Sequence, residues 1–135
     1  FEAAQYAQPI PGARELLREL RARGMALGVV TRNSHKAVLT VFADIEAVCD
    51  VVLAREAVRN VKPHPEHLAT CLNHLAVHPQ RALMVGDHPI DIEAGRRHGM
   101  TTVGVLTGNG SAEALREAGA DFVLNDATEI LTLLV

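Results

Sequence analysis

Residues 82–95 constrain the fold more than any other stretch, because an apolar run there passes almost directly into a helical pattern. The segment reads ALMVGDHPIDIEAG. A short apolar run that ends at a turn signal is typical of a strand buried on both faces, as in a parallel sheet. Pro89 suits the first turn of a helix, where its missing N–H costs nothing. The pattern predicts Asp87 at the carboxyl end of a strand and Asp91 in the first turn of the following helix.

Asp87 and Asp91 would then lie at the sheet edge where open α/β folds bind their ligands. Two carboxylates held close together are costly unless a cation lies between or beside them. Mg²⁺ is the natural candidate, because it prefers oxygen ligands. The alternative is an acid that caps the helix beside a second, solvated acid, and this stretch alone does not decide between the two.

Strands and helices alternate along the rest of the chain. The expected strands are residues 25–30, 51–53, 82–85, 101–105 and 122–124, and the expected helices are residues 13–23, 34–43, 65–75, 89–98, 111–118 and 127–134. Such alternation predicts an α/β fold, a mainly parallel sheet covered by helices on both faces. A chain of 135 residues is long enough for one such domain, so residues 1–135 are expected to form a single domain.

Composition excludes several classes of partner. Hydrophobic residues make up 48% of the chain, and the net charge is −3. The chain therefore lacks the excess of positive charge that is typical of proteins that bind nucleic acid or an anionic membrane. No apolar run approaches the roughly 20 residues that span a bilayer. Cys49 and Cys71 have no metal or redox spacing, so we expect two buried thiols in a reducing, cytoplasmic setting. The oligomeric state stays open.

Three chemically distinct residues are predicted at one edge of the sheet. Thr31 ends one strand, Asp87 ends another, and Lys62 lies on a loop between them in sequence. A hydroxyl beside free backbone N–H groups and a lysine both bind phosphate oxygens, while carboxylates hold a metal that offsets the remaining charge. Taken singly, each is better explained as a helix cap, a solvated lysine or a surface acid. His64 and His67 are expected to be loop and helix-surface residues.

These residues occur in motifs that resemble the haloacid-dehalogenase superfamily of hydrolases, in its phosphoglycolate-phosphatase-like branch. The resemblance runs from about residue 9 to residue 134. The segment VVTRN at 29–33 resembles the second motif, Lys62-Pro63 the third and GDHPID at 86–91 the fourth, and GADFV at 119–123 is similar to the usual ending. The resemblance implies a Rossmann-like three-layer α/β/α sandwich.

The resemblance also implies an activity, that of a Mg²⁺-dependent phosphatase acting on a small phosphorylated metabolite such as phosphoglycolate. Thr31, Lys62 and Asp87 would be catalytic, and Asp87 and Asp91 would serve Mg²⁺. Arg32 and Asn33 would join Thr31 and Lys62 in contacting the substrate, although a solvated Arg32 is an equal alternative. A non-catalytic phosphate- or metal-binding domain and a phosphomutase remain open, whereas the two motif acids argue against a metal-free dehalogenase.

One motif of the family is missing from the chain. No two aspartates are separated by a single residue, so the Asp-x-Asp of the first strand is absent. In relatives its first aspartate attacks phosphorus and its second acts as general acid/base, and the strand that carries it lies centrally in the sheet. We therefore expect the C-terminal part of a longer hydrolase, with nucleophile and substrate-selecting cap upstream. We also expect a gap one strand wide between the strands that end at Val30 and Val85.

Overall fold

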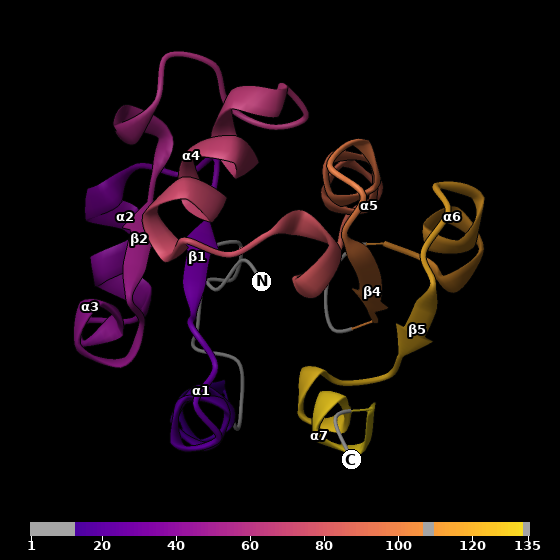
Figure 1. The fold of residues 1–135 in the computed structure, drawn as a ribbon, viewed down its shortest axis with the longest axis horizontal. Helices are drawn as coiled ribbons and strands as arrows, with labels where there is room; N and C mark the ends of the chain where they lie inside the picture. The colour runs from indigo at the N-terminus through magenta and orange to yellow at the C-terminus, as the bar shows by residue number, and fades with distance from the viewer. Residues whose placement is uncertain (1–12, 107–109, 134–135) are drawn as a thin grey trace.

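The computed structural model describes residues 13–106 and 110–133, in which strands and helices alternate (Figure 1). The strands are β1 (Gly28–Val30), β2 (Val51–Leu53), β3 (Leu83–Gly86), β4 (Thr101–Val105) and β5 (Phe122–Leu124). The α-helices are α1 (Ala13–Ala22), α2 (His35–Val41), α3 (Ile45–Val48), α4 (Pro65–Leu75), α5 (Pro89–Arg97), α6 (Ala112–Glu117) and α7 (Ile130–Leu133). The described residues also form the short 3₁₀ helices η2 (Arg55–Ala57), η3 (Pro79–Arg81) and η4 (Ala127–Glu129). The predicted parallel α/β fold is confirmed.

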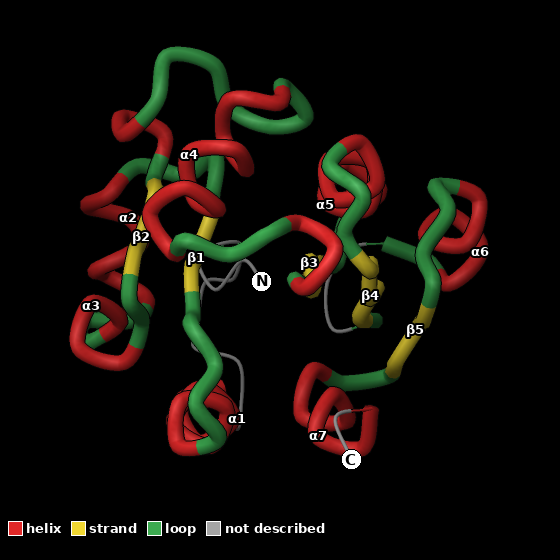
Figure 2. Tube along the Cα trace, in the orientation of Figure 1, coloured by secondary structure: helices red, strands yellow, loops and turns green. Residues whose placement is uncertain are grey.

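The strands form two separate parallel sheets. In one sheet β1 pairs with β2, and Val30 lies opposite Leu53. The other has the order β3-β4-β5, with Gly86 opposite Gly104. Figure 2 shows the two sheets side by side, and within the described residues no strand joins β1 to β3. Within the part of the chain that the structure describes, β1 and β3 are therefore not paired with each other, in agreement with the expected separation of these two strands.

An apolar cavity of about 250 Å³ lies between the two sheets. Its walls include Val30 of β1 and Met84 of β3, together with Leu20 of α1 and Leu68 of α4. The side chains around it are thus those of a domain core, although the backbone edges of β1 and β3 that face it are not paired with each other.

Helices cover both faces of the sheets. Helices α4, α5 and α6 pack on one face, while α1, α3 and the η4–α7 segment cover the other (Figure 1). Successive strand residues point to opposite faces. Val29 and Val85 accordingly belong to the cluster with α1, and Val30 and Met84 to the cluster with α4. This is the three-layer arrangement that the resemblance implies.

Three helices begin with a His-Pro dipeptide in which histidine is the N-cap. His64, His78 and His88 precede α4, η3 and α5, and each Nδ1 accepts the backbone N–H two residues later. The proline that follows occupies the first turn, where no N–H is required. This device sets the start of the two helices, α4 and α5, that bring residues to the site described below.

Some boundaries differ from those expected. Strand β1 covers only residues 28–30 of the predicted 25–30 strand, and a short helix, α3, follows α2 without having been predicted. The closing helix begins as 3₁₀ helix η4 because Asp126 caps that turn, and Leu134 lies outside the described residues. None of the helices in the described ranges combines the length and the apolar character needed to cross a bilayer.

Candidate active site

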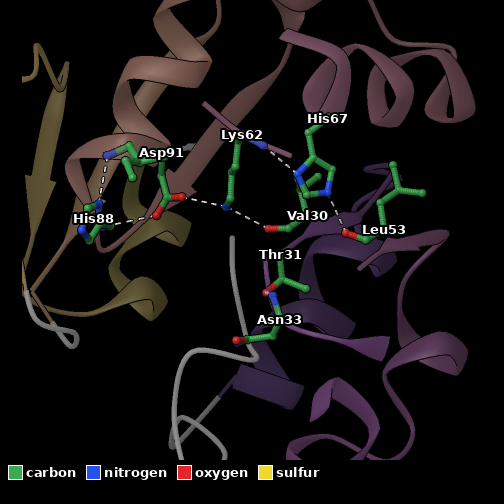
Figure 3. A network of polar contacts seen from close by, with 9 residues as sticks. Val30, Thr31, Asn33, Leu53, Lys62, His67, His88 and Asp91 are labelled. Carbon is green, nitrogen blue, oxygen red and sulfur yellow. Dashed lines mark hydrogen bonds and ion pairs between the residues drawn. The ribbon is translucent and has the colours of Figure 1, made fainter. Parts of the chain in front are cut away.

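Lys62 lies at the centre of the site and is fully buried. Its exposed fraction is 0%, and its ammonium donates to the carbonyl of Val30 at 2.9 Å and to Asp91 Oδ1 at 2.7 Å (Figure 3). Val30 is the last residue of β1, whereas Asp91 belongs to α5, which follows β3. Lys62 therefore connects the carboxyl ends of the two sheets. The alternative of a solvated loop lysine is wrong.

The charge of Lys62 is set by opposing effects. Burial of the ammonium lowers its pKa below the usual lysine range, while the negative charges of Asp91 and, less strongly, Asp87 raise it. Asp91 is 1% exposed and Asp87 5% exposed. A buried cation with two buried carboxylates near it is far costlier to assemble than a surface ion pair, which indicates a site built for charge.

Asp91 holds its place through the start of α5. It is the N3 residue of a capping box: Asp91 Oδ2 accepts the backbone N–H of His88 at 3.2 Å, and Oδ1 accepts from Lys62. Both carboxylate oxygens are thus bonded within the protein. Gly86 leaves the room for this arrangement, because a Cβ at Gly86 would overlap the Asp91 side chain.

Thr31 follows β1 and is also completely buried. Its backbone N–H donates to the carbonyl of Leu53 at 3.1 Å, which extends the β1–β2 ladder by one bond. Its hydroxyl oxygen accepts the N–H of Asn33 at 3.1 Å, so Thr31 and Asn33 form a tight turn below Lys62 in Figure 3. Arg32 between them is exposed, in agreement with the solvated alternative.

His67 is not the helix-surface residue that was expected. It is 0% exposed, its Nδ1 accepts the backbone N–H of Lys62 at 3.0 Å, and its Nε2 lies 3.0 Å from the carbonyl oxygen of Leu53. The sequence held a signal for this: His67 precedes Cys71 by four residues, so both share the buried stripe of α4. His64, by contrast, is an exposed cap residue.

The donor set suits a hard cation only in part. The described residues hold no group of three or more His, Cys, Asp or Glu that could bind a metal. Asp87 and Asp91 supply carboxylate oxygens, the ligand type that Mg²⁺ prefers. Because both oxygens of Asp91 are engaged by Lys62 and His88, Asp87 fits direct metal binding better than Asp91 does.

Neither cysteine belongs to this chemistry. Cys49 and Cys71 are both buried free thiols, as expected. Burial raises the pKa of Cys49 to about 11 and raises that of Cys71 as well. Both side chains are therefore protonated, unreactive parts of the core.

Comparison with known proteins connects this geometry to a family. The profile of haloacid dehalogenase-like hydrolases matches residues 2–105. Pyrophosphatase PpaX of Bacillus cereus (strain B4264) is 36% identical over 125 residues, an alignment that covers 89% of this chain and 56% of that protein. Validoxylamine A 7'-phosphate phosphatase of Streptomyces hygroscopicus subsp. limoneus is 38% identical over 127 residues, with 92% and 58% covered.

A solved structure agrees with the sequence relatives. A crystal structure described as a predicted phosphoglycolate phosphatase from Haemophilus somnus 129pt matches with a TM-score of 0.84 at 26% identity, covering 98% of this chain and 60% of that one. The chain thus spans little more than half the length of the curated relatives it matches. Because the profile matches residues 2–105, well over half of the sequence, the chain belongs to the haloacid dehalogenase-like hydrolase family.

Proposed function

We propose that the chain is the catalytic core, from its second motif onward, of a Mg²⁺-dependent phosphatase that hydrolyses a small phosphorylated metabolite. The observation that carries the proposal is the buried Lys62 ammonium, held between the Val30 carbonyl beside Thr31 and the Asp91 carboxylate. Relatives named as phosphatases support the reaction class. Residues 1–135 belong to one domain in this proposal, together with an upstream segment.

Each site residue has one task in the proposed reaction. Thr31 and Lys62 hold the oxygens of the transferring phosphoryl group, where hydroxyl and ammonium donate to its developing charge. Asp91 positions Lys62, and its negative charge raises the pKa of Lys62 against the opposite effect of burial. Asn33, whose backbone is bonded to Thr31, shapes the same turn, and the exposed Arg32 is free to contact the rest of the substrate. An upstream aspartate attacks phosphorus, and water then hydrolyses the aspartyl-phosphate.

Asp87 is the residue of this chain that would hold Mg²⁺ directly. Asp91 would contribute indirectly, by holding the Lys62 ammonium in place. When bound, the cation would offset the negative charge of the phosphoryl group. Asp87 follows β3 directly, so its backbone position is fixed by the β3–β4 ladder. The backbone of Gly110 also packs against it, since a Cβ at Gly110 would overlap the Asp87 carbonyl oxygen.

The nucleophile arrives on a strand that fills the space between β1 and β3. Among the described residues the facing edges of these strands are not paired with each other, and this separation, together with the apolar cavity between the strands, supports this part of the proposal. A parallel strand there would end at the same edge as Thr31 and Asp87, because carboxyl ends of parallel strands meet at one edge. We further propose a cytoplasmic setting, because both thiols are buried and free.

The test compares this chain with a version extended upstream through the first-strand Asp-x-Asp. The 135-residue chain should show no turnover of an aryl phosphate, since it lacks the attacking carboxylate. The extended protein should turn over the ester with Mg²⁺ and lose that activity with EDTA. Equal Mg²⁺-dependent activity in both proteins would overturn our account of the nucleophile.

Gly86 offers a test of the Asp91 position. In Gly86→Ala the added methyl group displaces the Asp91 side chain, so the Lys62 contact loosens and turnover falls. Overpacking of this kind also destabilises a fold by about 1–3 kcal/mol. Gly104→Ala is the matched control, because Gly104 lies opposite Gly86 and its Cβ would press on Leu115 instead.

Urea unfolding should show that both glycine variants of the extended protein lose stability. Steady-state kinetics, normalised to folded protein, should show reduced kcat only for Gly86→Ala. Equal kcat values in the two variants would mean that the position of Asp91 does not govern the reaction.

A further inference from the structure

His67 joins the loop that carries Lys62 to the end of β2, the strand that pairs with β1. The backbone N–H of Lys62 donates to His67 Nδ1, and His67 Nε2 contacts the carbonyl of Leu53 at the end of β2 (Figure 3). The Leu53 carbonyl also accepts the backbone N–H of Thr31. His67 is thus linked to Lys62 by one hydrogen bond, and to Thr31 by two hydrogen bonds that share the Leu53 carbonyl.

The two partners dictate one form of the imidazole. A backbone N–H can only donate, so Nδ1 must carry no proton, and a carbonyl can only accept, so Nε2 must carry one. Burial lowers the pKa of His67, and the nearby Lys62 charge acts in the same direction. His67 is therefore a neutral, doubly bonded ring in a closed environment.

These hydrogen bonds link Lys62 to both β1 and β2. Lys62 Nζ donates to the carbonyl of Val30, the residue before Thr31, while the Lys62 backbone is held by His67. Lys62 is thus fixed at both ends, the ammonium against β1 and the main chain, through His67, against β2. The residue after Lys62 is a proline, which has no N–H with which to make a further bond.

We propose that His67 is a positioning residue that anchors the Lys62 backbone to the end of β2 and so fixes the distance between the two phosphate-binding groups, Thr31 and Lys62. The functional half of this inference rests on the phosphatase proposed above. Nothing in it requires His67 to touch substrate. Both bonds are needed, because an anchor that lacks either link no longer relates Lys62 to β2.

Two substitutions cut one link each. His67→Asn keeps an acceptor near the position of Nδ1 but loses the donor to Leu53. His67→Gln keeps a donor near the position of Nε2 but loses the acceptor for Lys62, and His67→Leu removes both. The matched control is His64→Leu, which removes the N-cap of the same helix. The capping hydrogen bond of His64 comes from the Glu66 N–H and involves neither Lys62 nor Leu53.

All variants are made in the extended protein and assayed with an aryl phosphate and Mg²⁺, with kcat normalised to folded protein. We expect His67→Asn and His67→Gln each to lower kcat about tenfold or more with little change in KM, because misplacing a catalytic group by about 1 Å can cost as much as about 100-fold. His67→Leu should lower kcat little more than either, since the loss of one hydrogen bond already releases Lys62 from β2. Unchanged kcat in His67→Asn or His67→Gln, or an equal loss in His64→Leu, would overturn the proposal.

Amide hydrogen exchange separates this inference from the phosphatase proposal. The Lys62 N–H should lose protection in His67→Gln and His67→Leu and keep it in His67→Asn. If the parent protein failed to hydrolyse any phosphate ester, the proposed function would fall, while this exchange pattern would still support the anchor. A Lys62 amide that stays protected in His67→Gln and His67→Leu would overturn the proposed anchoring role of His67, whatever the activity.

Discussion

Lys62→Met in the extended protein is expected to abolish turnover and to destabilise the fold by about 3–5 kcal/mol, the usual cost of breaking a buried ion pair. Lys62 and Asp91 are 0% and 1% exposed, so the Asp91 carboxylate left behind would have neither solvent nor its cation. The substitution also removes the donor to the Val30 carbonyl at the end of β1. Both losses fall where the two sheets are connected.

A second substitution separates the loss of stability, caused by the unpaired Asp91 charge, from the loss of activity, caused by the missing ammonium. In Lys62→Met/Asp91→Asn the uncompensated charge is gone, and the asparagine oxygen still accepts the His88 N–H that caps α5. We expect the double variant to recover most of the lost stability in urea unfolding and none of the lost kcat. An active Lys62→Met protein would show that Lys62 does not stabilise the phosphoryl group. Full activity in the double variant would contradict the role of the pair.

The pattern of the sequence predicted the framework well, because burial and chain reversal leave strong local signals. The run ending at Gly86-Asp87, followed by Pro89, gave both the β3 strand and the α5 start in the right places. The separation of β1 from β3 was expected from the missing first motif, since the family places a strand between them. Helix α3 was missed because four residues are too few to show a period.

The site was harder to predict, because tertiary contacts decide it. A lysine before a proline is ordinarily a solvated loop residue, and only the fold shows that Lys62 is buried between β1 and α5. His67 was assigned to the helix surface from its residue type. Its four-residue spacing from Cys71 indicates the buried side of α4, but only the fold shows that this side faces the end of β2.

The largest effect on stability is expected for the 135-residue chain by itself, which should aggregate or lack fixed tertiary structure unless another segment fills the space between β1 and β3. The facing edges of these strands are not paired with each other, and an apolar cavity of about 250 Å³ lies between them. Residual cavities destabilise cores by about 24 cal/mol per Å³, so a void of this size costs about 6 kcal/mol. A whole domain is stable by only about 5–15 kcal/mol, so this cost by itself is comparable to the total stability.

Adding the upstream strand should therefore restore a single cooperative transition. Near-ultraviolet circular dichroism during urea unfolding, together with sedimentation velocity, measures this for the short and the extended proteins. An extension of equal length with a proline at the centre of the strand is the control, because proline cannot donate to a ladder in the middle of a sheet. A cooperative, monomeric transition of the short chain, with β1 and β3 directly paired, would show that the topology argued here is wrong. Rescue by the strand and not by its proline variant would show that a strand occupies the space between the sheets. That strand would end beside Thr31, Lys62 and Asp87, where an aspartate at its carboxyl end could attack the phosphoryl group.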